Sequence, residues 1–68
     1  MTPTAIRAAL ETLGWSTRHL ARVLHLPPTT PSNWTAGRYA IPSAIAEWLQ
    51  RRADAAKQAT RDDPPPRP

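Results

Sequence analysis

The sequence predicts a small all-α domain of four helices, and three observations support that fold class. Apolar residues recur in four segments at the three- and four-residue spacing of a helix face. No window alternates apolar and polar residues with the β-branched enrichment that strands show. Each helical segment also begins next to a proline or a hydroxyl side chain, as helix starts commonly do.

The first helix is expected to run from about Pro3 to Leu13. Thr2 can cap its amino end, and Gly14 can adopt the left-handed conformation that ends many helices. Proline also suits the first helical position, because no backbone donor is needed there. The residues on the predicted inner face are Ile6, Ala9, Leu10 and Leu13.

The second helix is expected over residues 17–24, with Ser16 as its N-cap and Trp15 packed on Leu20 as a hydrophobic staple. His25 occupies the turn with a positive φ, which histidine tolerates better than most residues. Leu26 follows as an apolar plug. The residues expected to point inward are Leu20, Ala21 and Leu24, and those outward are Thr17, Arg18 and Arg22.

The third helix follows a stretch rich in proline. Pro31 conflicts with a helix that begins at Pro28, because proline lacks a backbone donor and disfavours α geometry at Thr30. We therefore expect Thr30 to be the N-cap and Pro31 the first helical residue, with an irregular or 3₁₀ first turn. The helix is then short, from about residue 31 to 36, and Gly37 ends it.

The fourth helix starts near Pro42, and alanines extend it to about residue 59. From Arg61 onward, four prolines in eight residues predict a disordered tail. The chain is accordingly divided into one domain, residues 1–60, and a tail, residues 61–68. The apolar stripe of this helix consists of Ile41, Ile45, Trp48 and Leu49.

The charge distribution points to an acidic partner. The formal net charge is +4, from nine basic and five acidic residues, and no carboxylate lies between Glu11 and Glu47. Arg18, Arg22 and Arg38 all lie in that interval. A basic segment without internal acids is typical of proteins that bind phosphate, nucleic acid or an acidic protein.

Composition excludes several other classes. The chain has no cysteine, which removes cysteine-based zinc sites and disulfide scaffolds, and His19 and His25 alone do not predict a metal site. Its few acids (Glu11, Glu47, Asp54, Asp62 and Asp63) assemble no catalytic pair, so we expect no enzyme, no cofactor and no small-molecule ligand. No apolar stretch approaches the ~18 residues of a membrane span, and no signal sequence opens the chain. We therefore expect a cytoplasmic protein without membrane contact, which would be nucleoid-associated if the partner of its basic segment is nucleic acid.

The spacing within residues 15–38 is more specific than the helix count. A helix of eight residues, a three- or four-residue turn and a second short helix make a helix-turn-helix arrangement, whose second helix can enter a DNA major groove. The residues that would lock the two helices together are Leu20, Ala21, Leu24, Leu26 and Trp34.

Over about residues 3–52 the sequence resembles the Cro/cI-like, xenobiotic-response-element type of phage and bacterial repressors. The resemblance is carried by Leu20-Ala21, Leu26, Trp34 and Gly37 at fixed spacing, within the runs 14–26 and 33–38, and continues through Ile41-Pro42 and Trp48-Leu49. It implies a lambda-repressor-like fold, sequence-specific binding to double-stranded DNA by a homodimer, and transcriptional repression. His25 replaces the usual turn glycine, and Pro31 stands where the family commonly has a β-branched core residue.

Positions in this family imply roles for individual residues. Those implied to contact DNA bases are Pro28, Thr29, Ser32 and Asn33, and those implied to contact phosphates are Ser16, Thr17, Arg18, Arg38 and Tyr39. Asparagine can pair with adenine through two hydrogen bonds, so we expect half-sites that contain A·T pairs.

The core is marginal for a chain of this length, because only 15 of the 27 hydrophobic residues are larger than alanine, and self-association would reinforce it. The dimer contacts expected on the last helix are Ile45, Trp48, Leu49 and Arg52. The shortness of the chain suits an autorepressor on a short inverted repeat, whose occupancy follows its own concentration. The alternative is a small helical adaptor or inhibitor that uses the same fold to bind a protein.

Overall fold

The computed structural model describes residues 1–63 and 66. All regular secondary structure in those residues is helical, in four helices: α1 (Pro3–Leu13), α2 (Thr17–Leu24), α3 (Thr29–Thr35) and α4 (Ser43–Asp62). The predicted all-α class with four helices is confirmed. Within the same residues, none of the helices has the length and apolar character needed to cross a membrane.

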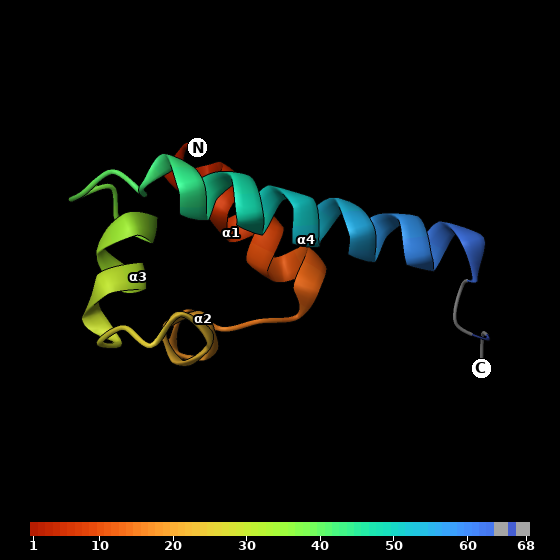
Figure 1. Ribbon diagram of the computed structural model, residues 1–68, viewed down its shortest axis with the longest axis horizontal. Helices are drawn as coiled ribbons and strands as arrows, with labels where there is room; N and C mark the ends of the chain where they lie inside the picture. Colours follow the sequence, from red (N-terminus) through yellow and green to blue (C-terminus); the bar gives the residue numbers. More distant parts are fainter. Residues whose placement is uncertain (64–65, 67–68) are drawn as a thin grey trace.

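The helices pack around α1. One side of α1 lies against the first half of α4, and α1 also contacts α3, which in turn packs against α2 (Figure 1). The second half of α4 extends beyond the other helices. The short helices α2 and α3 therefore lie side by side below the longer pair in Figure 1 and share one core with it.

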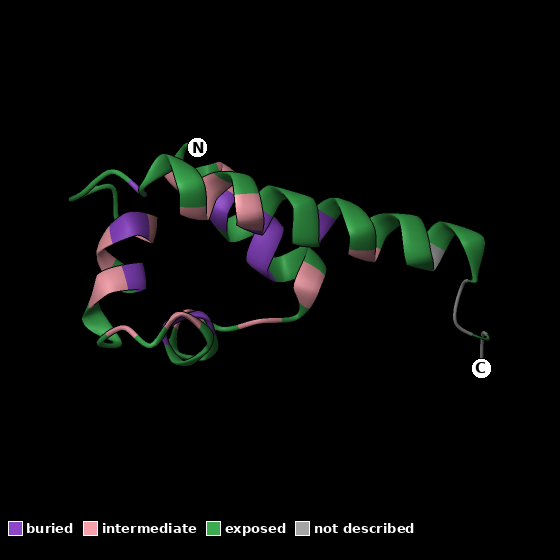
Figure 2. Ribbon diagram, viewed as in Figure 1, coloured by how far each residue is buried: buried purple, intermediate pink, exposed green. Residues whose placement is uncertain are grey.

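The core lies where α1, α2, α3 and α4 face one another. Figure 2 shows the buried positions on the inward sides of these helices, with the outer surfaces exposed. Leu20 and Leu49 have no exposed surface, and Trp34 keeps 4% of its own. The remaining buried hydrophobic residues are Ile6, Ala9, Leu10, Ala21, Ile41 and Ala53. The inward faces predicted for the first two helices agree with this core, although Leu13 and Leu24 are only half-buried.

Side-chain hydroxyl groups cap the amino ends of α1 and α2. The hydroxyl of Thr2 accepts a hydrogen bond from the backbone N–H of Ala5 at 3.0 Å, and that of Ser16 accepts one from His19 at 3.1 Å. Both N-caps are the predicted ones. These bonds satisfy donors that the first helical turn leaves without a partner.

Helices α1, α2 and α3 end in the same hydrogen-bond pattern. In each, a backbone N–H just beyond the helix donates to the carbonyl oxygen five residues earlier: Trp15 to Leu10 at 2.9 Å, Leu26 to Ala21 at 2.8 Å and Arg38 to Asn33 at 3.0 Å. The pattern needs a left-handed residue just before each donor. These residues are Gly14 at φ 70°, His25 at φ 57° and Gly37 at φ 77°. The positive φ expected at His25 is confirmed.

The start expected for α3 is wrong by two residues. The helix begins at Thr29 with Pro28 as its N-cap, so Thr30 is not the cap and Pro31 is the third helical residue. The first backbone N–H groups of a helix have no partner inside it, so proline loses no hydrogen bond at this position. The first turn does contain a 3₁₀-type bond, from the N–H of Thr30 to the carbonyl oxygen of Pro27 at 3.0 Å.

Helix α4 is longer than expected. It continues to Asp62, so the prediction that regular structure stops at Arg61 is wrong for these two residues. Proline restricts mainly the residue before it, and Asp63, which precedes Pro64, is the first residue to leave helical geometry, at φ −142° and ψ 72°. Half of the predicted disordered tail, residues 64–65 and 67–68, lies outside the described residues.

Candidate nucleic-acid interface

Helix α3 has one face buried in the core and one face exposed. Pro31 and Trp34 point into the core, with Pro31 less than 2% exposed. Thr29 and Ser32 lie on the opposite side, where their side chains are exposed. An α-helix has about 3.6 residues per turn, so residues three positions apart lie on the same side. The seven-residue helix α3 therefore has one buried side and one exposed side. All four residues predicted to contact bases keep accessible surface, since Pro28 is also exposed and Asn33 is half-buried.

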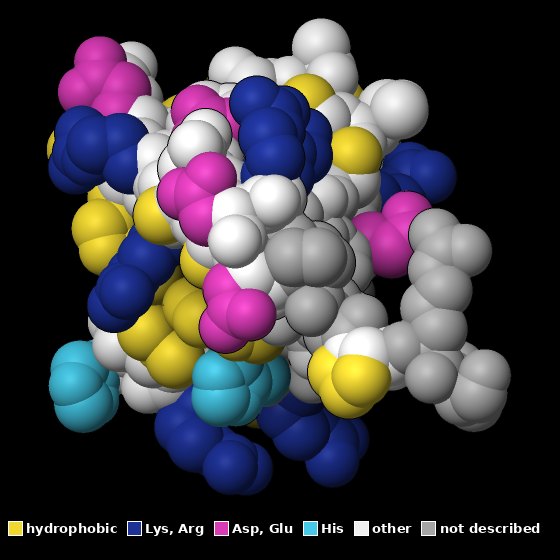
Figure 3. Space-filling model, turned by 90° about the vertical axis from the view of Figure 1, so that its right-hand side faces the viewer, with side chains coloured by type: hydrophobic (Ala, Val, Ile, Leu, Met, Phe, Trp, Pro, Cys, Tyr) yellow, Lys and Arg dark blue, Asp and Glu magenta, His cyan; other side chains and the backbone are white. Residues whose placement is uncertain are grey.

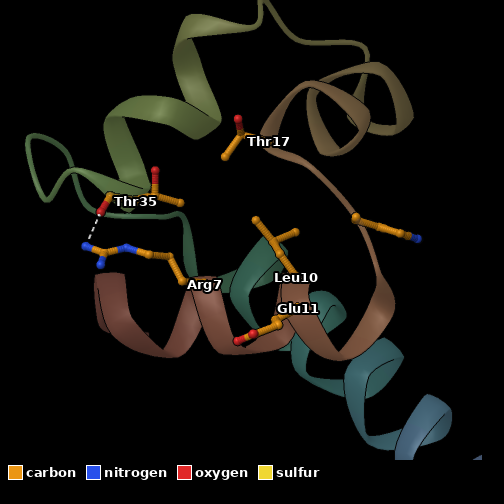
Figure 4. A pocket seen from close by; sticks show the side chains of 6 residues that line it. Arg7, Leu10, Glu11, Thr17 and Thr35 are labelled. Carbon is orange, nitrogen blue, oxygen red and sulfur yellow. Dashed lines mark hydrogen bonds between the residues drawn. The ribbon is translucent and has the colours of Figure 1, made fainter.

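A side-chain hydrogen bond holds the carboxyl end of α3 against α1, and the turn that follows α3 lies close to the start of α1. Nη2 of Arg7 donates to the backbone carbonyl oxygen of Thr35 at 2.9 Å (Figure 4). A Cβ atom at Gly37 would lie 3.4 Å from Cγ of Pro3, so the two chain segments are close together. The bond joins residues 28 positions apart in the sequence, so no local pattern indicates this role of Arg7.

Asn33 and Arg38 contact each other through their side chains. Nη1 of Arg38 donates to Oδ1 of Asn33 at 3.4 Å, which is at the long end for a hydrogen bond. Arg38 is exposed in the loop that follows α3. The predicted base contact at Asn33 and the predicted phosphate contact at Arg38 are therefore adjacent in space.

Of the three predicted phosphate contacts at the start of α2, Ser16 and Arg18 are exposed and Thr17 is half-buried. The Ser16 hydroxyl is used as the helix cap, and Arg18 is exposed. Thr17 is half-buried and borders an open cavity of about 440 Å³. The other residues that border this cavity are Arg7, Leu10, Glu11, Trp15 and Thr35, and Figure 4 shows Thr17 projecting from the start of α2 toward α3.

The basic residues of the acid-free segment reach solvent. Arg18, Arg22 and Arg38 are exposed, and Tyr39 in the loop after α3 keeps 68% of its surface. In Figure 3 the two histidines and several basic side chains lie along the lower edge, on the α2 side, and the acidic side chains visible on this face lie above them. Further basic side chains lie among the acidic ones higher on this face, so the lower edge is the part of this view that carries basic side chains without acidic ones.

No family model, curated protein or solved structure matches this chain. Among the residues that the structure describes, no three histidine, cysteine or acidic side chains are grouped as metal ligands would be. The polar groups described above on α2, α3 and the loop after α3 are arginine guanidinium groups, hydroxyl groups and the amide of Asn33.

The four residues predicted to form a dimer contact differ in their exposure. The prediction for Leu49 is wrong, because its side chain has no exposed surface and packs entirely in the core. Ile45 and Trp48 are half-buried, and Arg52 is exposed. The last three occupy positions i, i+3 and i+7 of α4, which lie on one side of a helix.

An aromatic cluster surrounds Trp48. The ring centroids of Trp48 and Trp15 are 6.0 Å apart. Cζ of the Arg52 guanidinium lies 5.7 Å from the centroid of the Trp48 ring. The rings of Trp15 and His19 meet edge to face, with their centroids 4.9 Å apart. The cluster links the segment between α1 and α2 to α4. Spacing within α4 pairs Trp48 with Arg52, but the contact between the two tryptophans depends on tertiary packing.

Proposed function

We propose that this chain is a sequence-specific DNA-binding regulator with a helix-turn-helix fold, which represses transcription as a homodimer. Helix α3 is the recognition helix in this proposal, and α2 lies across the DNA backbone. A short inverted repeat near the protein's own gene is the proposed operator, which would make the protein an autorepressor.

The observation that carries the proposal is the arrangement of α3. A short helix with Pro31 and Trp34 buried beneath it presents Thr29 and Ser32 outward. Hydroxyl groups of this kind can donate to or accept from base edges, and the threonine methyl can contact thymine. The segment around α3 contains no acid from Thr12 to Ala46, and Glu11 of α1 is the carboxylate that borders the same cavity as Thr17 and Thr35.

Phosphate contacts in this proposal come from the start of α2 and the loop after α3. Ser16, Thr17 and Arg18 flank the amino end of α2, where the helix dipole favours an anion. Tyr39 offers an exposed hydroxyl on the other side of α3. Two copies would associate through Ile45, Trp48 and Arg52 of α4, whose shared side of the helix is not fully used by the core.

The decisive experiment is selection of binding sites from random duplex DNA by the purified chain. We expect a two-fold symmetric site whose half-site centres are about 34 Å apart, one turn of DNA. Affinity for the selected duplex should fall as salt rises, with a log–log slope of about −0.9 for each phosphate contacted.

Two outcomes would contradict the proposal. Selection without enrichment of any sequence would exclude specific recognition. Binding to a protein partner that resists high salt, together with no affinity for duplex DNA, would instead support the adaptor function that also fits a small basic helical domain.

A further inference from the structure

Asn33 and Arg38 are connected twice at the carboxyl end of α3. The backbone N–H of Arg38 donates to the backbone carbonyl oxygen of Asn33 at 3.0 Å, and the side chains meet at 3.4 Å between Nη1 and Oδ1. Gly37, at φ 77°, makes the turn that allows both contacts. The backbone bond fixes the relative position of the two backbones before any ligand arrives, so less ordering is needed on binding.

The chemistry of the guanidinium decides which atom of Asn33 faces it. Arginine has five N–H donors and no acceptor, whereas an asparagine amide has an acceptor oxygen and a donor nitrogen. Only Oδ1 can therefore accept from Arg38, and both donors of Nδ2 remain for another partner. Apart from one lone pair of Oδ1, which lies beside a positive charge, the pair presents donors alone.

A surface of donors discriminates between the two purines. In the major groove guanine presents two acceptors, N7 and O6, whereas adenine presents the acceptor N7 and the donor N6–H₂. Asparagine pairs with adenine only if Oδ1 accepts from N6–H₂. Here the guanidinium lies next to that oxygen and would repel the adenine donor, but its planar fork matches N7 and O6 of guanine.

We propose that Asn33 and Arg38 act as one recognition unit that requires a guanine in each half-site. Arg38 donates to O6 and N7 of the guanine, and Nδ2 of Asn33 donates to an acceptor on the neighbouring base. The proposal rests on the DNA-binding function proposed above. It replaces two expectations from the sequence, namely a phosphate contact by Arg38 and an adenine contact by Asn33.

The first test changes the DNA. In the selected duplex, each half-site guanine is replaced in turn by adenine or by 7-deazaguanine, which lacks the N7 acceptor, and affinity is measured by fluorescence anisotropy at fixed salt. At one position per half-site we expect both replacements to weaken binding by about 5- to 100-fold. The same replacements outside the half-sites should leave affinity unchanged.

The second test changes the protein. Arg38→Lys keeps the charge but loses the fork, and we expect it to reduce the preference for guanine over adenine about 10-fold. Asn33→Ala should also reduce this preference, and the double variant should reduce it no further than Arg38→Lys alone, because the two residues act together. Arg51→Lys makes the same change on an exposed position of α4 and should leave the preference intact. Circular dichroism checks that each variant is folded.

Several results would overturn the proposal while leaving the DNA-binding function in place. One is a selected half-site without a G·C pair. Another is adenine preferred at the contacted position, with that preference lost in Asn33→Ala and kept in Arg38→Lys. Independent, additive effects of the two substitutions would also exclude a joint unit. A chain that shows no sequence preference on any duplex would overturn both this inference and the proposed function.

Discussion

Pro31 is buried beneath α3, and Pro31→Ala measures what that burial contributes. Alanine removes two buried methylene groups, worth about 0.8 kcal/mol each, or about 1.6 kcal/mol together. It also frees the unfolded chain, which costs about 0.4–1 kcal/mol. We expect Pro31→Ala to destabilise the protein by about 2–3 kcal/mol. That is a large fraction of the roughly 3–10 kcal/mol typical of a domain this small.

The matched control is Pro28→Ala, because Pro28 is exposed and makes no side-chain cap bond. Pro28→Ala should lower the free energy of unfolding only through the greater entropy of the unfolded chain, by about 0.4–1 kcal/mol. Urea unfolding followed by tryptophan fluorescence measures both variants, and the difference between them isolates the burial of the ring. If Pro31 instead strained α3, as its position in the sequence suggested, Pro31→Ala would equal the wild type or exceed it in stability. That result would refute the packing argument.

Three further predictions concern the turn, the phosphate contacts and the dimer. His25→Gly keeps the left-handed conformation at the turn but removes its steric cost, about 1 kcal/mol for a non-glycine residue, so the melting temperature should rise by about 4–8 °C in calorimetry. An unchanged melting temperature would mean that His25 is not strained there. Arg18→Ala should weaken binding to all duplexes alike and make the salt slope shallower by about one unit in anisotropy titrations, whereas an effect confined to one sequence would place Arg18 on a base. The melting temperature of the wild type should rise with protein concentration, because a dimer stabilises the folded state, and Trp48→Ala should abolish that dependence; a concentration-independent wild type would contradict the dimer.

The helix ends that could be predicted are those set by neighbouring residues. Thr2 and Ser16 cap within three residues of themselves, and Gly14 and His25 act on the turn that immediately precedes them. The start of α3 could not be predicted in the same way. Proline is costly or harmless in a helix according to its distance from the first turn, and the burial of Pro31 that stabilises the earlier start depends on tertiary packing.

The burial of Trp34 was predictable from the helix-turn-helix spacing, and the exposure of Ser32 was implied by the family resemblance; in the structure Trp34 is buried and Ser32 is exposed. Periodicity does not report contacts between distant segments, such as the bond from Arg7 to the end of α3. It also does not report which atom of Asn33 is already engaged, because that depends on the path of the loop after Gly37.

Helix α3 is too short to be stable by itself, since isolated helices below about 12 residues are marginal in water, and it has only seven. Its position must come from the contacts around it. Pro31 and Trp34 anchor its underside, Arg7 bonds its last carbonyl group, and the turn at Gly37 ties the following loop back to Asn33. A helix anchored by these contacts loses little conformational entropy when it binds a rigid ligand. That rigidity suits the reading of a DNA groove, where small shifts of a side chain break the hydrogen bonds that distinguish one base from another.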